Sequence, residues 1–156
     1  MLPMDKVWNA TAIVSRVFAG LGGALLLVAA VLVSTDLERS QEFYGKTLGL
    51  TLSAETIKNH LVFECGNGTT LLLYGRPSPN KADHTQVRFW STDIAADVRE
   101  LDGRGVEFDT VEFGDLKMVD HVLTSPGIGK SAWFKDPDGN TLAISNESAE
   151  IMRKAA

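Results

Sequence analysis

The stretch Ser34-Thr35-Asp36-Leu37 returns almost unchanged later in the chain as Ser91-Thr92-Asp93-Ile94. Each copy ends an apolar stretch and opens a segment with helical spacing, and each is followed by a glycine (Gly49 or Gly105) and a segment typical of a strand. Matched landmarks at nearly equal spacing indicate an internal repeat, in which one supersecondary unit is used twice. This repeat predicts the fold more firmly than any other feature of the sequence.

The length and composition predict one globular domain. The chain has 156 residues, of which 44% are hydrophobic and 22% are charged, as is ordinary for a protein with a real core. The net charge of -5 argues against a nucleic-acid partner, which needs a basic face to neutralise phosphates. The single Cys65 cannot form an internal disulfide and fits a reducing compartment, so we expect a cytoplasmic protein.

An uncharged apolar run, Val17 to Val33, lies between Arg16 and Asp36. Its length approaches that of a membrane-spanning helix, so a membrane-anchored form is one alternative, and a signal peptide with an unusually long leading segment is another. The repeat, however, requires a strand directly before Asp36. We therefore interpret residues 24–34 as a buried strand and residues 1–23 as an N-terminal extension, and we expect no membrane partner.

Residues 24–75, module one, follow a β-α-β-β-β pattern. Asp36 is expected to cap the helix, and Gly49 to end it in a left-handed conformation. The expected strands are residues 24–34, 50–55, 60–65 and 69–75. Asn67-Gly68 joins the last two and is a strong hairpin signal. Residues 76–83, with two prolines and an asparagine, are expected to form a linker.

Residues 84–146, module two, repeat the pattern with a longer middle. Asp93 is expected to cap a helix over residues 94–104, and Gly105 to end it. The expected strands are residues 85–91, 106–113, 131–135 and 141–145, with a further short one near residues 119–123. Residues 147–156 form a helix-prone C-terminal tail.

The stretch from Gly114 to Gly129 is predicted to be a long, mixed loop. Loops of this length in a compact domain are often lids over ligands. Asp120-His121 within it would form an acid/base pair if the loop closed over a site, although a surface role is the simpler interpretation.

A duplicated β-α-β-β-β unit that contains DLERSQEFYGKTLGL and the closing hairpin AWFKDPDGNTLAI resembles the glyoxalase/bleomycin-resistance/dioxygenase superfamily, or vicinal oxygen chelate fold. The resemblance covers residues 24–146 and rests on Asp36-Leu37, Ser40, Phe43-Tyr44, Leu48-Gly49-Leu50 and Asp136-Pro137-Asp138-Gly139. It implies an α+β protein whose tandem modules form a curled half-barrel sheet, and a homodimer. The fold hosts lyases, isomerases, dioxygenases and proteins that bind without chemistry.

In metal-dependent members of that superfamily, His and Glu side chains on the concave face hold a divalent ion. The resemblance places the four ligand positions at Ala29 (or Ala10, from an earlier strand), one of Leu71 to Leu73, Gln86 and Ala143. Alanine and leucine have no donor atoms, and a catalytic zinc normally takes three protein ligands. We therefore expect no metal cofactor. A rebuilt site from His60, Glu64 and His84 is the alternative.

Strand alternation predicts what the concave cup holds instead. Gln86, Arg88 and Trp90 would face the cup, while Val87 and Phe89 would pack beneath the helix. Arginine can form two hydrogen bonds with a carboxylate or phosphate, and tryptophan offers a stacking surface. Alternatively, Arg88 pairs with an acid and Trp90 belongs to the core. Further candidates for the ligand site are Tyr74, Trp133 and Ala143.

These features predict a protein that binds a small, partly aromatic or apolar, anionic molecule without a metal, as the bleomycin-resistance type does. The alternative is a metal-dependent lyase, isomerase or dioxygenase of the same superfamily with displaced ligands. Whether the protein is an enzyme stays open at this point.

Overall fold

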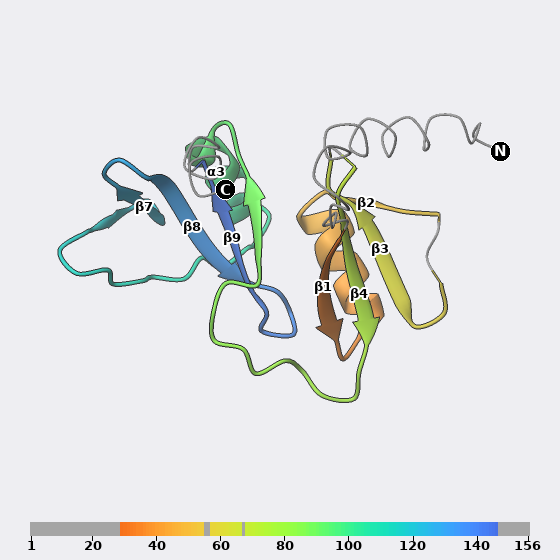
Figure 1. Ribbon diagram of the computed structural model, residues 1–156. Coiled ribbons are helices and arrows are strands. Elements are labelled where there is room, and N and C mark those ends of the chain that lie inside the picture. The colour runs from red at the N-terminus through yellow and green to blue at the C-terminus, as the bar shows by residue number, and fades with distance from the viewer. Residues whose placement is uncertain (1–28, 55–56, 67, 147–156) are drawn as a thin grey trace, which may run out of the picture.

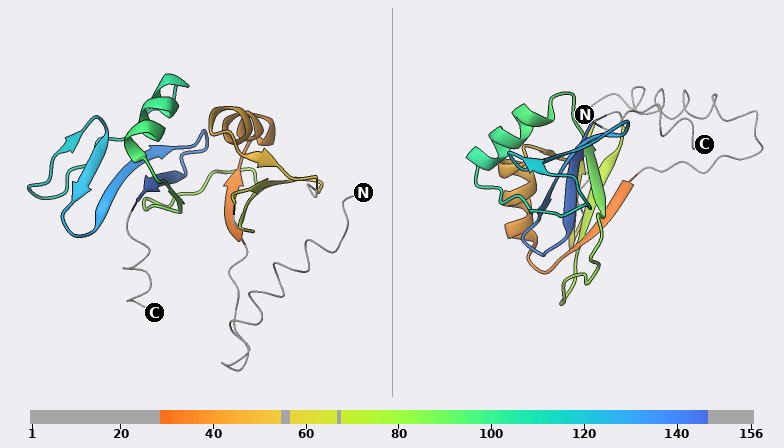
Figure 2. Two further views of the ribbon diagram at one scale, coloured as in Figure 1. Left: turned by 90° about the horizontal axis from the view of Figure 1, so that it is seen from above. Right: turned by 90° about the vertical axis from the view of Figure 1, so that its left-hand side faces the viewer.

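The computed structural model describes residues 29–54, 57–66 and 68–146. It consists of two β-sheets, one from each module, with the helices of both modules on the same side of the sheets (Figure 1, Figure 2). The predicted N-terminal extension, the first part of the predicted strand 24–34 and the C-terminal tail lie outside the described residues. Among the residues described, no helix is long and apolar enough to cross a membrane.

Module one forms a four-stranded sheet with the order β1-β4-β3-β2, in which β1 runs parallel to β4. Its strands are β1 (Ala29–Ser34), β2 (Thr51–Leu52), β3 (His60–Glu64) and β4 (Thr70–Gly75). Helix α2 (Leu37–Gln41) continues directly into a π-helix, η1 (Glu42–Thr47). The predicted cap is confirmed, because Asp36 Oδ1 accepts a hydrogen bond of 3.1 Å from Arg39 N. Gly49, with φ of 78°, turns the chain out of the helix in the left-handed conformation that was expected.

Module two forms a five-stranded sheet with the order β5-β9-β8-β7-β6, in which β5 runs parallel to β9. Its elements are β5 (Val87–Trp90), α3 (Ile94–Gly103), β6 (Met118–Val119), β7 (Val122–Ser125), β8 (Gly129–Lys135) and β9 (Thr141–Ser145). Asp93 caps α3 as predicted, accepting 3.1 Å from Ala96 N. The repeat therefore places each capping aspartate between a parallel edge strand and a helix.

One prediction for the middle of module two is wrong. Residues 106–113 form no continuous strand: Phe108 makes one isolated bridge to Phe134, and Asp109 N donates to Trp133 O. The reason is that β7 already pairs with the first half of β8, which leaves only the end of that edge for the earlier segment.

The predicted lid loop, Gly114 to Gly129, contains the hairpin of β6 and β7. Asp120 and His121 form its turn with φ of 48° and 65°, the positive values that a tight hairpin turn requires. In addition, the predicted strand 50–55 is only two residues long, at β2.

Both modules contribute to one hydrophobic core on the helix side of the sheets. Its buried members are Leu32, Tyr44, Leu61, Phe63, Leu71, Leu73, Ile94, Val98, Val106, Val122, Ala132, Phe134, Leu142 and Ile144. The fully buried Phe134 of module two contacts the ring of Phe43 from module one, with centroids 6.4 Å apart. Val87 and Phe89 pack against the core, as strand alternation predicted. The opposite faces of the two sheets point away from this core and are called the open face below.

Candidate functional site

The residues on which the family resemblance rests meet in space. The turn between β8 and β9 reaches across to the start of α2, where Asp138 accepts hydrogen bonds from Thr35 N (3.0 Å) and Thr35 Oγ1 (2.5 Å). Arg39 Nη2 lies 3.2 Å from the same carboxylate, and Ser40 Oγ lies 3.4 Å from it. Burial raises the pKa of Asp138, but the hydrogen bonds from Thr35 and the charge of Arg39 outweigh burial and hold it below its ordinary value.

A second buried carboxylate completes this contact. Asp136 Oδ2 accepts 2.7 Å hydrogen bonds from Tyr44 Oη and Asn140 Nδ2, and Asn140 Nδ2 also donates to Val33 O. Burial and the neighbouring Asp136 charge raise the pKa of Tyr44 far above its ordinary value, so this phenol stays protonated and donates. We call this set the polar joint: Thr35, Arg39, Ser40, Tyr44, Asp136, Asp138 and Asn140. Its groups are turned toward one another, which indicates a structural role.

The predicted ligand residues of module two lie in a row across the open face. Arg88 on β5 pairs with Ala143 on β9, and Ala143 pairs with Trp133 on β8. Trp90, two residues along β5, is 67% exposed. Trp133 Nε1 donates to Thr85 Oγ1 at 3.1 Å, so this indole has both a flat face and a fixed orientation. The structure thus brings Arg88, Trp90 and Trp133 together on one face of the sheet, with the fully buried Ala143 between Arg88 and Trp133.

Tyr74 lies on the open face of module one, away from that row. It pairs with Val33 and His60 on the neighbouring strands, and its ring lies 6.1 Å from the imidazole of His60. The sheet register also settles which leucine occupies the second ligand position. Leu72 is on the open face, because Leu71 and Leu73 are buried in the core on the other side.

The residues present do not fit the metal site of the superfamily. The four positions are Ala29, Leu72, Gln86 and Ala143, which offer one amide and no carboxylate, imidazole or thiolate. His60 and Glu64 share a face of β3, but four residues along a strand separate their backbones by about 13 Å. Among the described residues, no group of three or more His, Cys, Asp or Glu side chains is arranged to hold a metal ion.

Gln86 has an unusual environment. Both its Nε2 and its Oε1 are buried, and neither has a hydrogen-bond partner among the described residues. Leaving such a group unpaired costs about 1–3 kcal/mol, and buried amides in folded proteins are normally paired with protein, water or a ligand. Gln86 therefore supplies one donor and one acceptor at the position where metal-dependent relatives hold a ligand.

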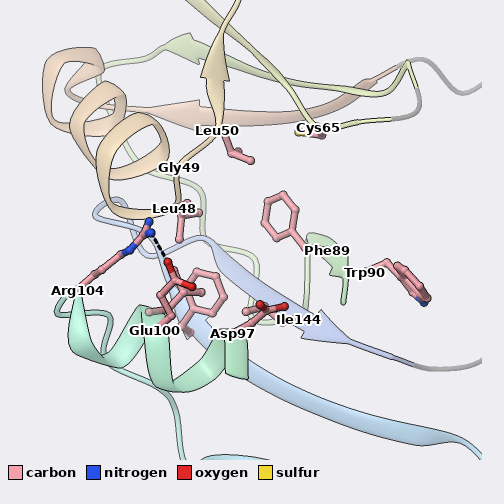
Figure 3. A pocket seen from close by; sticks show the side chains of 12 residues that line it. Leu48, Gly49, Leu50, Cys65, Phe89, Trp90, Asp97, Glu100, Arg104 and Ile144 are labelled. Carbon is pink, nitrogen blue, oxygen red and sulfur yellow. Dashed lines mark hydrogen bonds and ion pairs between the residues drawn. The ribbon is translucent and has the colours of Figure 1, made fainter. Parts of the chain in front are cut away.

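Sequence reasoning missed a cavity of about 420 Å³ between the two modules, on the helix side. Figure 3 shows Phe89 pointing into it between the end of η1 and α3. The residues lining this intermodule cavity are Leu48, Gly49, Leu50, Cys65, Phe89, Trp90, Asp97, Glu100, Leu101, Arg104, Phe134 and Ile144. The repeat offers a signal for this cavity. Asp97 lies 57 residues after Ser40, which is also the spacing between Asp36 and Asp93, so the two positions correspond. Ser40 belongs to the buried joint, whereas its counterpart Asp97 is an acid.

Comparisons with known proteins agree with this geometry. The profile of the glyoxalase/bleomycin resistance protein/dioxygenase superfamily matches residues 26–144. No curated protein sequence matches the chain significantly.

Solved structures share the fold at low sequence identity. A glyoxalase family protein from Bacillus anthracis is 16% identical with a TM-score of 0.65, and the match covers 81% of this chain and 98% of that one. An antibiotic binding protein from Streptomyces sp. CB03234 is 23% identical with a TM-score of 0.61, covering 82% and 99%. A lactoylglutathione lyase from Agrobacterium tumefaciens is 21% identical with a TM-score of 0.55, covering 80% and 94%. Together with the profile match and the duplicated modules, these findings show that the chain belongs to the glyoxalase/bleomycin resistance protein/dioxygenase superfamily.

Proposed function

We propose that the protein binds a small, partly aromatic, anionic molecule on its open face without using the metal site of its superfamily. The observation that carries this proposal is the buried, unpartnered amide of Gln86. A ligand with one hydrogen-bond acceptor and one donor would pair both ends of this amide, which removes the cost of leaving them unpaired.

The neighbours of Gln86 suggest the chemistry of that ligand. Trp90 is largely exposed and Trp133 is held by its hydrogen bond to Thr85, so both offer flat surfaces for stacking. Arg88 lies two residues before Trp90 on the same face of β5, where its guanidinium would favour a carboxylate or phosphate on the ligand.

Open-face positions of module one suggest an apolar contribution. Val31, Leu72 and Val62 form a row across β1, β4 and β3, and Val31 is 56% exposed. A ligand with an aromatic or aliphatic body would cover this surface and stabilise the complex through the hydrophobic effect. One solved structure with the same fold is an antibiotic binding protein from Streptomyces, which supports a small-molecule ligand for this chain.

Calorimetry and thermal unfolding would test the proposal on metal-free protein, with EDTA present throughout. The probes are a panel of aromatic carboxylic acids and bleomycin-type glycopeptides. We expect at least one probe to stabilise the protein by about 2.7 kcal/mol at one hundred times its dissociation constant. Gln86→Leu and Arg88→Ala should each weaken the binding of that probe.

Matched control variants separate the site from general effects of the substitutions. Gln41→Leu and Arg99→Ala make the same changes at exposed positions of α2 and α3, and they should bind the probe as the wild type does. Binding that requires an added divalent ion, with stoichiometric metal retained on purification, would instead favour the lyase, isomerase or dioxygenase alternative. A Gln86→Leu variant that binds every probe normally would remove the basis of the proposal.

We also propose a cytoplasmic homodimer in which a second copy shares the open face with the ligand and encloses it there. The exposure of Val31 and Trp90 supports this arrangement, because large apolar side chains on one surface favour association. Light scattering across a concentration series would measure the mass, and a monomer at all concentrations would contradict the dimer.

A further inference from the structure

The intermodule cavity occupies the place that the polar joint occupies in the other half of the molecule. Positions 57 residues apart correspond between the modules, as Asp36 and Asp93 do. By this correspondence Ser40 and Tyr44 of the joint match Asp97 and Leu101 of the cavity wall. The duplication therefore built two equivalent interfaces, of which one is filled.

The joint is filled by carboxylates from the turn between β8 and β9. The corresponding turn of module one, between β3 and β4, contributes Cys65 to the cavity wall and then two glycines, Gly66 and Gly68. Glycine has no side chain that could reach α3. Consequently nothing from the described part of this turn replaces Asp136 and Asp138, and a space of about 420 Å³ remains.

The cavity wall presents a hydrogen-bond acceptor at the position where the helix of the polar joint presents a donor. In the joint, hydroxyl groups of Ser40 and Tyr44 donate to buried carboxylates. In the cavity wall, the first of these donors is replaced by a carboxylate, Asp97, and the second by the apolar Leu101. An occupant of the cavity would therefore have to donate hydrogen bonds, where the occupant of the joint accepts them.

The charges of the wall agree with this reversal. Two carboxylates, Asp97 and Glu100, and one guanidinium, Arg104, line the cavity. Arg104 forms an ion pair with Glu100 and donates to Thr47 O at 3.0 Å, which ties α3 to the end of η1. Asp97 accepts from Ser91 Oγ at 2.5 Å, and no cation is paired with it among the ion pairs of the described residues. The wall is thus left with one negative charge in excess.

Aromatic and aliphatic side chains form the rest of the cavity. Phe89 points into it and Trp90 stands at its edge (Figure 3). Aromatic rings beside a carboxylate are the surroundings that favour organic ammonium groups, through cation–π attraction. We infer that the intermodule cavity binds a small organic cation, an ammonium group on an aromatic or aliphatic body. Its volume lies in the range of small-molecule sites.

Three probes of similar size would test this inference: phenethylammonium, phenethyl alcohol and phenylacetate. Titrations of the full chain would be followed by calorimetry and by amide chemical shifts. We expect phenethylammonium to bind about tenfold more tightly than phenethyl alcohol, because it adds one charge-assisted hydrogen bond. Phenylacetate should bind most weakly of the three. The largest shift changes should fall on α3 between Asp97 and Arg104. Equal affinities for the three probes, or no binding, would overturn the inference.

Variants on one helix provide matched controls. Asp97→Asn keeps the size of the side chain and its ability to accept from Ser91, and it should weaken phenethylammonium about tenfold, through the loss of one charged hydrogen bond. Asp102→Asn makes the same change at an exposed position of α3 and should bind like the wild type. Glu100→Gln removes the charge of the second carboxylate in the wall and should also weaken the binding of phenethylammonium. Equal behaviour of Asp97→Asn and Asp102→Asn would refute the site.

The two sites share Trp90 at their border but have different polar anchors: Asp97 on α3 for the cavity, and Gln86, directly before β5, for the open face. Gln86→Leu should therefore bind phenethylammonium normally, whereas Asp97→Asn should bind the aromatic acids normally. Failure of one proposal leaves the other standing, and the two variants show which has failed.

Discussion

The polar joint and the intermodule cavity are two versions of one interface. Both lie between the helix of one module and the β-hairpin turn of the other, yet the joint is packed with hydrogen-bonded carboxylates and the cavity is open. The difference comes from a few side chains, since the strands and helix caps of the two modules correspond. Duplication gives both modules the same strands and helices, whereas the side chains of the β-hairpin turn determine whether the interface is packed or contains a cavity.

The largest effect on stability is expected when corresponding residues of the polar joint and the cavity wall are exchanged. Ser40 is fully buried beside Asp138, so Ser40→Asp places a second carboxylate there and should lower the free energy of unfolding by about 4 kcal/mol, as for an uncompensated buried charge. The reciprocal Asp97→Ser should lower it by only about 1 kcal/mol, because that wall is open and the main loss is the hydrogen bond from the buried Ser91. Urea unfolding measures both, and equal losses would show that the two interfaces do not differ in packing.

Removing one donor from the joint should have a smaller effect. Tyr44→Phe deletes one of the groups that donate to Asp136, while Asn140 still donates to it, and the loss of one hydrogen bond to a buried carboxylate costs about 2 kcal/mol. Leu101→Ala changes the corresponding residue of α3, a half-buried side chain of the cavity wall, and serves as the comparison for Tyr44→Phe. A Tyr44→Phe variant as stable as the wild type in urea would show that the phenol contributes packing alone.

The joint should also respond to acid. Because the folded-state pKa of Asp138 lies below its ordinary value of about 3.9, its contribution to stability is present above that value. The contribution is lost as the pH falls through the lower folded-state pKa. Asp138→Asn should therefore be less stable than the wild type at pH 7, and the difference should shrink as the pH falls below about 4. Urea unfolding from pH 7 to pH 2.5 gives both curves, and a constant difference between them would contradict this assignment.

Filling the cavity should have the smallest effect on stability. Leu101→Phe adds apolar volume to the wall and is expected to raise the free energy of unfolding by about 0.5 kcal/mol, as cavity-filling substitutions commonly do. The same variant should bind phenethylammonium more weakly, since the added ring occupies its space. Val98→Phe, at a buried core position of α3, is the matched control and should destabilise through overpacking. Unchanged affinity in Leu101→Phe would place the cation elsewhere.

Local signals in the sequence predicted most of the framework. Asp36 and Asp93 cap helices, Gly49 and Gly105 have the positive φ expected of helix ends, and the hairpin around Asp136 to Gly139 forms as predicted. These features depend on neighbouring residues, which the sequence displays directly. The family resemblance then arranged them correctly.

Long-range competition explains what the sequence did not predict. Residues 106–113 have a strand-like pattern, but β7 takes the first half of the edge of β8 on which they would pair. The hairpin turn at Asp120-His121 is not predictable from the sequence, because asparagine or glycine usually marks such a turn and neither is present at these two positions. The cavity depends on side chains from both modules and on what a distant turn lacks, and no local pattern encodes that combination.

The polar joint also has a consequence for the order of events during synthesis. The hydrogen bond from Thr35 N to Asp138 joins residues 103 positions apart, and the one from Asn140 to Val33 joins residues 107 apart. The start of the first helix is therefore completed by side chains that are synthesised more than 100 residues later. The contacts of the joint link the two modules across most of the sequence, and such long-range contacts form late in folding.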